Sequence, residues 1–393
     1  MYNDNPLRTS DLRIHNQKMV LSRIYEARKA GISQSALVAK TGLKAPTIFR
    51  IFSRLKEQNL IEDAKDGDTE NAADSVRKGR RPLVYKVRKD ALYTLGVEFW
   101  ASGISLGVFN FNGDQVFSRT EPLKAGISVQ EVIDFIAIMV NEALENLKIN
   151  RSKVIGLGVA APGQVDVANR KVVSYSRIKG MKDLALADIL EEKLGLTVIL
   201  HNSCSVIALS EFQYGNYDHK DSLFTILLRN GVAGAFVNEK GIYITSQGTT
   251  MESGHIPVDP QGPACTCSIR GCLEAHLSAL DKDNAKTGQP LFAGLEERLA
   301  KGDRQAEQIA AKAANCLFVV TKTIMRLFAP RSFLVLANGQ KLSRAIAENL
   351  INFWRGESDA FVTVPPRIFS NNYNTLVFQK GASDLVISNY FNY

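Results

Sequence analysis

The stretch Glu252–His276, ESGHIPVDPQGPACTCSIRGCLEAH, holds three of the chain's five cysteines and two of its five histidines within 25 residues. Cys265, Cys267 and Cys272 follow the spacing C-x-C-x4-C, and His255 precedes them. Three thiolates and one imidazole form a ligand set that suits tetrahedral Zn²⁺ in a closed, structural site. We therefore expect these four side chains to hold structural zinc.

Other interpretations of the cysteines carry less weight. A redox site would favour C-x-x-C at the start of a helix, and this spacing lacks it. A single catalytic thiol would leave its neighbouring cysteines without a purpose, and unligated buried thiols are the remaining alternative to a metal. His276 is a less favoured fourth ligand, because it would lie on the helix that Leu273 begins.

The chain's length and charge distribution predict several domains with separate roles. Its 393 residues exceed one ordinary core, and we find neither an export signal nor a run of about 18 apolar residues. We expect a cytoplasmic protein without membrane contact and with reduced cysteines. The first 90 residues hold 19 Lys and Arg against 11 Asp and Glu, whereas the other 303 hold 29 of each. The first quarter is therefore a candidate module for binding a polyanion.

The basic quarter predicts three helices. The first has amphipathic spacing from Ile14 and stops at Gly31, the second follows a capping Ser33, and the third begins at Ala45 after a turn at Gly42. A short turn between the last two helices is typical of a helix-turn-helix, whose third helix enters the DNA major groove. A small bundle with a solvated basic face is the alternative. The expected outward residues of the third helix are Lys44, Thr47, Arg50, Arg54 and Lys56.

A strand, a long polar loop and a second strand follow this helix. The loop ends in RKGRRP, residues 77–82. Arginines at the tip of a β-wing can reach backbone phosphates or a narrow minor groove, so we expect Arg80 and Arg81 to bind DNA. Residues 1–88 are therefore predicted to form a winged helix-turn-helix domain.

The rest of the chain, after the basic quarter, has a pattern of two successive halves, each with three hairpin strands followed by a helix and a strand. This order predicts an α/β body with the duplicated, two-lobed actin-like fold, with a ligand cleft between the lobes. We expect a small lobe at 89–202, against which the C-terminal residues 379–393 pack back. The large lobe at 203–378 would carry the zinc site.

Two motifs resemble the ROK family of repressors, open reading frames and sugar kinases. ESGH followed by CTCSIRGCLE is similar to the family signature, and GLGVAAPGQVD is similar to its Pro-Gly element. ROK repressors also carry a winged helix and a GRRP element, so the resemblance covers essentially the whole chain. It implies an actin-like body of the RNase H-like class. Ser268 is a departure, because the family usually has Gly there.

The resemblance also implies a sugar pocket whose loop the zinc would hold in place. Carboxylates, an amide and an imidazole can exchange hydrogen bonds with neighbouring hydroxyls. Each of these groups could instead be a helix cap or a surface residue. The positions that match the family's sugar-binding residues and Pro-Gly element are Gly163, Asn202, Glu252, His255 and Glu274.

The nucleotide elements of the family's kinases are altered. The catalytic base position holds Ser203, whose hydroxyl accepts a proton poorly at neutral pH. The first phosphate loop reads EFWAS from Glu98, with Trp100 at a glycine position, and the second reads RNG, with Arg229 at a glycine position. The adenosine loop reads LANGQ, residues 336–340. We therefore expect no catalytic residues and no kinase activity.

Together these features predict a sugar-responsive transcriptional regulator, most simply a repressor of carbohydrate uptake or catabolism genes. It would bind double-stranded operator DNA as a homodimer or a dimer of dimers. A sugar, a sugar phosphate or a protein partner docking on the body are candidate signals. The alternatives are an active ROK sugar kinase with a basic appendage, and a zinc-stabilised regulator that answers only to a protein.

Overall fold

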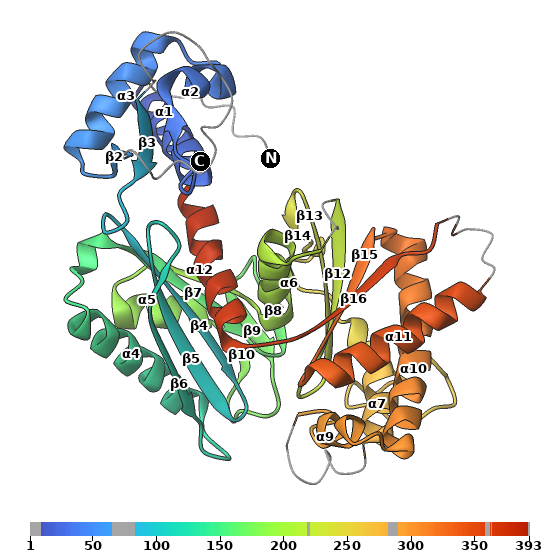
Figure 1. Cartoon of the computed structure of the whole chain (residues 1–393). Helices are drawn as coiled ribbons and strands as arrows, with labels where there is room; N and C mark the ends of the chain where they lie inside the picture. Colours follow the sequence, from blue (N-terminus) through green and yellow to red (C-terminus); the bar gives the residue numbers. More distant parts are fainter. Residues whose placement is uncertain are drawn as a thin grey trace.

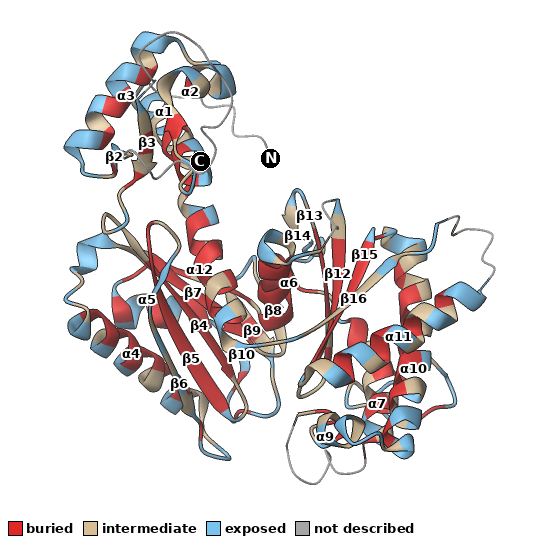
Figure 2. Ribbon diagram, in the orientation of Figure 1, coloured by how far each residue is buried: buried red, intermediate tan, exposed pale blue. Residues whose placement is uncertain are grey.

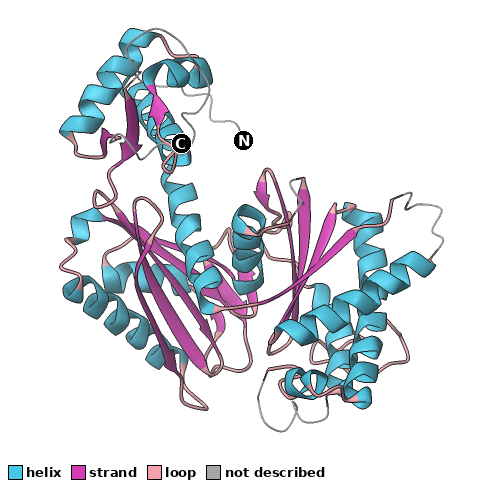
Figure 3. Cartoon of the chain, viewed as in Figure 1, coloured by secondary structure: helices cyan, strands magenta, loops and turns pink. Residues whose placement is uncertain are grey.

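The computed structural model describes residues 9–64, 83–217, 221–281, 290–357, 362 and 364–391. Two five-stranded sheets form the body, and a small N-terminal domain lies beyond one end of the first sheet (Figures 1 and 3). In the described part of the chain, no helix is both long enough and apolar enough to cross a membrane.

The N-terminal domain combines three helices with a three-stranded sheet of order β1-β3-β2, the arrangement expected for a winged helix. Residues 65–82, which include Arg80 and Arg81 of the predicted wing, lie outside the described residues. The elements are α1 (Thr9–Glu26), β1 (Ile32–Ser33), α2 (Gln34–Thr41), α3 (Ala45–Glu57), β2 (Ile61–Asp63) and β3 (Val84–Val87).

Local chemistry sets the helix ends of this domain. The Ser33 hydroxyl accepts a hydrogen bond from the Ala36 amide at 3.2 Å, as expected of an N-cap, and Gly42 ends α2 at φ 70°. The expectation that α1 runs to Gly31 was wrong, because the helix ends at Glu26. The Arg28 guanidinium donates to the backbone oxygens of Tyr25 and Asn112, at 3.1 and 3.0 Å. This side chain satisfies a terminal carbonyl and ties the end of the helix to the body.

The first body sheet has the order β11-β7-β4-β5-β6, with β4 parallel to β7 and antiparallel to β5. Helices α4 (Val129–Asn146) and α5 (Leu186–Leu194) pack on one face, and α12 (Thr375–Phe391) packs on the other. A small sheet of order β10-β9-β8 follows β7. The strands are β4 (Tyr93–Trp100), β5 (Gly103–Asn110), β6 (Gln115–Pro122), β7 (Val154–Ala161), β8 (Gln164–Asp166), β9 (Lys171–Ser174), β10 (Lys182–Leu184) and β11 (Val198–Asn202).

Two glycines let the backbone of α12 lie directly on this sheet. A Cβ atom at Gly96 would stand 1.9 Å from the Gln379 carbonyl oxygen. One at Gly158 would stand 1.8 Å from the Ala382 carbonyl oxygen. Any side chain at either position would push the C-terminal helix away from the sheet.

The second sheet has the order β14-β13-β12-β15-β16, and buried residues cover both of its faces (Figure 2). Helix α6 (Ser203–Tyr214) packs on one face, and α7 (Leu273–Leu280), α9 (Leu295–Ala300), α10 (Arg304–Phe328) and α11 (Gln340–Gly356) lie on the other. The strands are β12 (Ser222–Leu228), β13 (Val232–Asn238), β14 (Gly241–Ile242), β15 (Ser332–Ala337) and β16 (Arg367–Asn372).

Helix α12 connects the body to the N-terminal domain (Figure 1). Ile387 and Phe391, near its end, belong to the same buried cluster as the core of the three N-terminal helices. The Tyr25 ring of α1 lies 5.4 Å from the Phe391 ring and 5.5 Å from the Phe111 ring, between centroids. The N-terminal domain is therefore packed on the body through apolar contacts and is not merely tethered to it.

Candidate functional site

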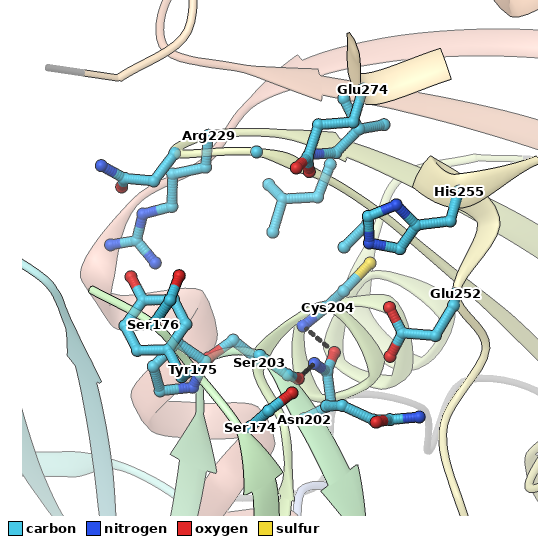
Figure 4. A pocket seen from close by; sticks show the side chains of 18 of the residues that line it. Ser174, Tyr175, Ser176, Asn202, Ser203, Cys204, Arg229, Glu252, His255 and Glu274 are labelled. Atoms are coloured by element: carbon cyan, nitrogen blue, oxygen red, sulfur yellow. Dashed lines mark hydrogen bonds between the residues drawn. The ribbon is translucent and has the colours of Figure 1, made fainter. Parts of the chain in front are cut away.

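A cavity of about 610 Å³ lies between the two sheets, a volume that suits a small organic ligand. Residues from both lobes line it (Figure 4). The junction of β11 and α6 forms one wall, and the loop after β12, the short helix Ser253–His255 and the start of α7 form another.

Asn202 ends β11 and caps α6. Its Oδ1 atom accepts hydrogen bonds from the backbone amides of Cys204 and Ser205, at 2.8 and 3.3 Å. Its Nδ2 atom donates to the Gly163 carbonyl at 2.6 Å. Gly163 has φ 76°, and a Cβ atom there would stand 2.3 Å from the Ser174 carbonyl oxygen. Asn202 is thus a structural cap, and its role in sugar binding stays a prediction.

Three further residues expected to bind sugar face the same cavity (Figure 4). Glu274, in the first turn of α7, accepts a hydrogen bond from the Val232 amide at 2.8 Å through Oε2. Glu252 is open to the cavity, and desolvation by the surrounding protein raises its pKa to about 7 against the opposing charge of His255. The structure brings Glu252, His255 and Glu274 together, and their role in sugar binding stays a prediction.

Ser203 is the first residue of α6 and lies beside Asn202 on the cavity wall. Its hydroxyl is buried and has no hydrogen-bond partner among the described residues. Buried polar atoms are normally paired, so this hydroxyl is available to a ligand. Its equivalence to the catalytic base of the family's kinases stays a prediction.

Arg229 and Glu98 form a buried ion pair across the gap between the lobes. Glu98, on β4, is fully buried, and burial raises its pKa to about 7 although the charge of Arg229 opposes this shift. The Arg229 guanidinium carbon lies 4.5 Å from the Trp100 ring centroid and 4.9 Å from that of Phe378. The Arg229 side chain thus lies between strand β4 and the loop after β12, packed against two aromatic rings.

The carboxylate of Glu296 binds the backbone amides at the N-terminus of α11. Glu296, on α9, accepts hydrogen bonds from the backbone amides of Lys341 at 3.1 Å and Leu342 at 2.8 Å. The N-terminus of a helix is a favourable place for an anion. Here the anion is the Glu296 side chain, next to residues 336–340, which the resemblance equates with the adenosine loop. The sequence did not predict this contact.

The cysteine cluster has the compactness of a metal site. One ligand atom from each of His255, Cys265, Cys267 and Cys272 lies within 4.8 Å of the other three. The Cys267 and Cys272 sulfurs are 3.5 Å apart, close to the spacing of about 3.8 Å expected for tetrahedral zinc. His276 is not part of this group of ligands. The donor set fits Zn²⁺, with His255 favoured over His276.

Ser268 lies on the loop between the second and third cysteines. Its φ is 71°, in the left-handed region that favours glycine, and its amide donates to the Cys265 carbonyl at 3.1 Å. This backbone conformation explains why the family usually has Gly at this position.

The expected DNA-binding residues occupy different environments. Lys44, Arg50 and Lys56 are exposed, whereas Thr47 and Arg54 are half-buried. Phe49 and Ser53 on the same helix are also exposed and were not among the expected contacts. Their positions opposite the buried residues of α3 were the signal that could have found them.

The sequence pattern of the ROK family matches residues 94–353, well over half of the chain. The chain belongs to the ROK family. This ROK protein is 25% identical to the xylose repressor of Bacillus spizizenii over 263 residues, which cover 67% of the chain and 65% of the repressor. The match therefore spans slightly less than two thirds of that relative's length.

Solved structures show the fold of this ROK protein. A ROK family transcriptional regulator described as a homologue of the E. coli MLC protein matches with a TM-score of 0.78 and 18% identity, over 96% of this chain and 97% of its own. The glucokinase of Streptomyces griseus, solved with glucose and AMPPNP, matches with a TM-score of 0.63 and 21% identity, over 75% of this chain and 99% of its own. The predicted family and the two-lobed α/β fold are confirmed.

Proposed function

We propose that this ROK protein is a sugar-responsive transcriptional regulator. Its N-terminal domain would bind operator DNA, and its interlobe cavity would bind a sugar or sugar phosphate without phosphorylating it. The observation that carries the proposal is the position of Arg229, which is bound to Glu98 and stacked on Trp100 between the two former phosphate loops.

Phosphoryl transfer requires room for nucleotide phosphates beside backbone amides, and a group that orients the acceptor hydroxyl. In this chain the Arg229 guanidinium and the Trp100 indole fill the first space. The Glu296 carboxylate accepts hydrogen bonds from the backbone amides at the start of α11. Ser203 stands at the position where the resemblance expects the carboxylate base. These features lie on separate elements and all oppose kinase activity, which favours a regulator over an active sugar kinase.

The cavity retains the chemistry needed for carbohydrate. Glu252 and Glu274 can accept hydrogen bonds from neighbouring hydroxyls, and Ser203 can donate or accept one. Zinc held by His255 and the three cysteines would stabilise the segment that leads into α7, because closed structural sites of this kind contribute folding energy. The chain's own side chains would bind and orient the sugar.

Helix α12 supplies a physical route between the cavity and the N-terminal domain. Phe378, near its start, contacts the Arg229 guanidinium, and Phe391, at its end, packs against Tyr25. A helix of 17 residues spans about 25 Å at about 1.5 Å per residue. Sugar binding that shifts the lobes would move this helix, with a coupling free energy of about 1 to 3 kcal/mol that is typical of allosteric effectors.

We also propose that the chain acts as a homodimer or a dimer of dimers, since paired half-sites about 34 Å apart match two recognition helices. We propose three domains: the DNA-binding domain at 1–88, the small lobe at 89–202 together with 379–393, and the large lobe at 203–378. A protein that docks on the body is the third candidate signal, besides a sugar and a sugar phosphate.

The proposal is tested with the full-length chain in a thermal-shift screen of sugars and sugar phosphates. We expect one class of compound to raise the unfolding temperature, and Glu252→Gln to abolish this rise. Glu297→Ala, an exposed carboxylate of the same lobe, should retain it. ATP turnover that depends on the stabilising sugar would revive the kinase alternative. No response to any sugar would favour a protein signal.

A further inference from the structure

Phe49 is an apolar side chain on the outward face of α3. It is 62% exposed, whereas Phe52, three residues later, is 2% exposed and packs edge-on against Tyr85 with 4.6 Å between ring centroids. The core of the N-terminal domain therefore does not need the Phe49 ring. An aromatic ring left in water on a helix that is expected to contact DNA requires a separate explanation.

The surroundings of Phe49 define what could cover it. Pro46, Phe49, Arg50 and Ser53 recur at helical spacing and are all exposed. They lie opposite the buried side chains of α3, which are Ile48, Ile51, Phe52 and Leu55. Helix α3 carries two arginines and one lysine against a single acidic residue, Glu57 at its last position, and Lys44 precedes it. The ring therefore stands within a cationic face.

The charge of this face selects the occupant. A second copy of the same face would repel the first, because both carry positive charge. Duplex DNA supplies negative phosphates on both sides of a major groove that admits an α-helix. Within that groove the apolar feature of the bases is the 5-methyl group of thymine.

We propose that Phe49 is a specificity-determining residue that contacts the 5-methyl group of a thymine in each operator half-site. This inference rests on the proposed DNA-binding function. Contact between the ring and the methyl group removes apolar surface from water without leaving a polar group unpaired. Arg50, the next residue, can bind a phosphate or the edge of a guanine on the same face.

The test begins with a duplex selected by the full-length protein from a random-sequence library. Each thymine of that duplex is then replaced, one at a time, by deoxyuridine, which removes only the methyl group. Affinities are measured by fluorescence anisotropy for the wild type, Phe49→Ala and Ile138→Ala. Ile138 is an exposed apolar residue of α4 and serves as the matched control.

We expect deoxyuridine at one or two positions per half-site to weaken wild-type binding about fourfold. This change corresponds to about 0.8 kcal/mol for one buried methyl group. In Phe49→Ala the same substitution should leave the affinity unchanged, and Ile138→Ala should behave as the wild type. Phe49 is exposed, so the unfolding temperature of Phe49→Ala should match that of the wild type.

Two results would overturn the inference while leaving the proposed function in place. One is a selected duplex that tolerates deoxyuridine at every thymine. The other is a methyl effect that persists in Phe49→Ala. If the first result came with a loss of self-association in Phe49→Ala, the ring would form a protein contact instead. Failure to select any duplex would instead reject the DNA-binding function itself.

Discussion

Arg229 and Glu98 stand 131 positions apart in the chain and form an ion pair that joins the loop after β12 to strand β4. The side chain of Glu98 is fully buried and that of Arg229 is 13% exposed. One end of the large-lobe sheet is therefore held to the small lobe by a charge contact. The same guanidinium packs on the Trp100 ring, so the contact joins both lobes at the edge of the cavity.

The first prediction concerns this pair. Arg229→Met should lower the free energy of unfolding by about 3 to 5 kcal/mol at pH 8, because it leaves the buried Glu98 carboxylate without a partner. The loss should be smaller at pH 6, where Glu98 can take up a proton. Chemical denaturation of the wild type and the variant at both pH values measures this change in the free energy of unfolding. The double variant Glu98→Leu with Arg229→Met should be more stable than Arg229→Met alone, and equal or lower stability would contradict this interpretation.

The second prediction is the pH dependence of Glu98 itself. Burial raises the pKa of Glu98 to about 7 in the folded chain, above its ordinary value of 4.5. The folded state therefore holds this proton more tightly, and the associated stability is present below about pH 4.5 and is lost as the pH rises through about 7. The stability of the wild type relative to Glu98→Gln should thus fall between pH 5 and pH 8. A difference that is constant over this range would show that Glu98 titrates normally.

The third prediction concerns the metal. The purified chain should contain about one zinc per molecule, and chelation or Cys267→Ser should lower both the unfolding temperature and the response to sugar. Cys316→Ser, a half-buried thiol on α10 outside the cluster, should leave the metal content unchanged. Elemental analysis and calorimetry give both readouts. A Cys267→Ser variant with full zinc content and full stability would rule out this ligand.

The fourth prediction uses the backbone strain at Ser268. Because its φ is 71°, Ser268→Gly should raise the free energy of unfolding of the zinc-loaded chain by about 1 kcal/mol. Ser268→Ala keeps the Cβ atom and should give no such gain. If alanine stabilises the protein as much as glycine does, backbone strain is not the cause.

The fifth prediction concerns the contacts of basic side chains with DNA phosphates. Affinity for DNA should fall steeply with salt, and Arg50→Ala should reduce the slope of that dependence by about one. Arg80→Glu with Arg81→Glu should abolish binding, whereas Arg344→Ala on α11 should have no effect. Binding that ignores reversal of the two wing arginines would remove the wing from the interface.

Parts of the fold were predictable because they follow local rules. The Ser33 cap, the turn at Gly42 and the buried stripe of α3 depend on residues within one or two turns of each other. The predicted end of α1 was wrong: the chain leaves the helix after Glu26, where the Arg28 side chain bonds the Tyr25 carbonyl and reaches Asn112, far along the chain. The cluster of His255 with three cysteines could be predicted because metal chemistry restricts the types and spacing of ligands, and zinc at this cluster stays a prediction.

The contacts that define the cleft were not predictable in the same way. The resemblance to the ROK kinases places Arg229 and Trp100 at positions where those enzymes have glycine, but their contact with each other and with Glu98 depends on how the two lobes meet. The double use of Asn202 as a cap and a cavity residue depends on the packing of Gly163 beside it. Such long-range contacts follow from tertiary packing, which residue spacing alone does not encode.

The most direct test of the central claim is the affinity for the selected duplex, measured with and without the sugar that stabilises the protein. We predict that the sugar changes the dissociation constant by about 5- to 150-fold, and that Glu252→Gln removes this change. An affinity that is identical in the absence and in the saturating presence of that sugar would contradict the account.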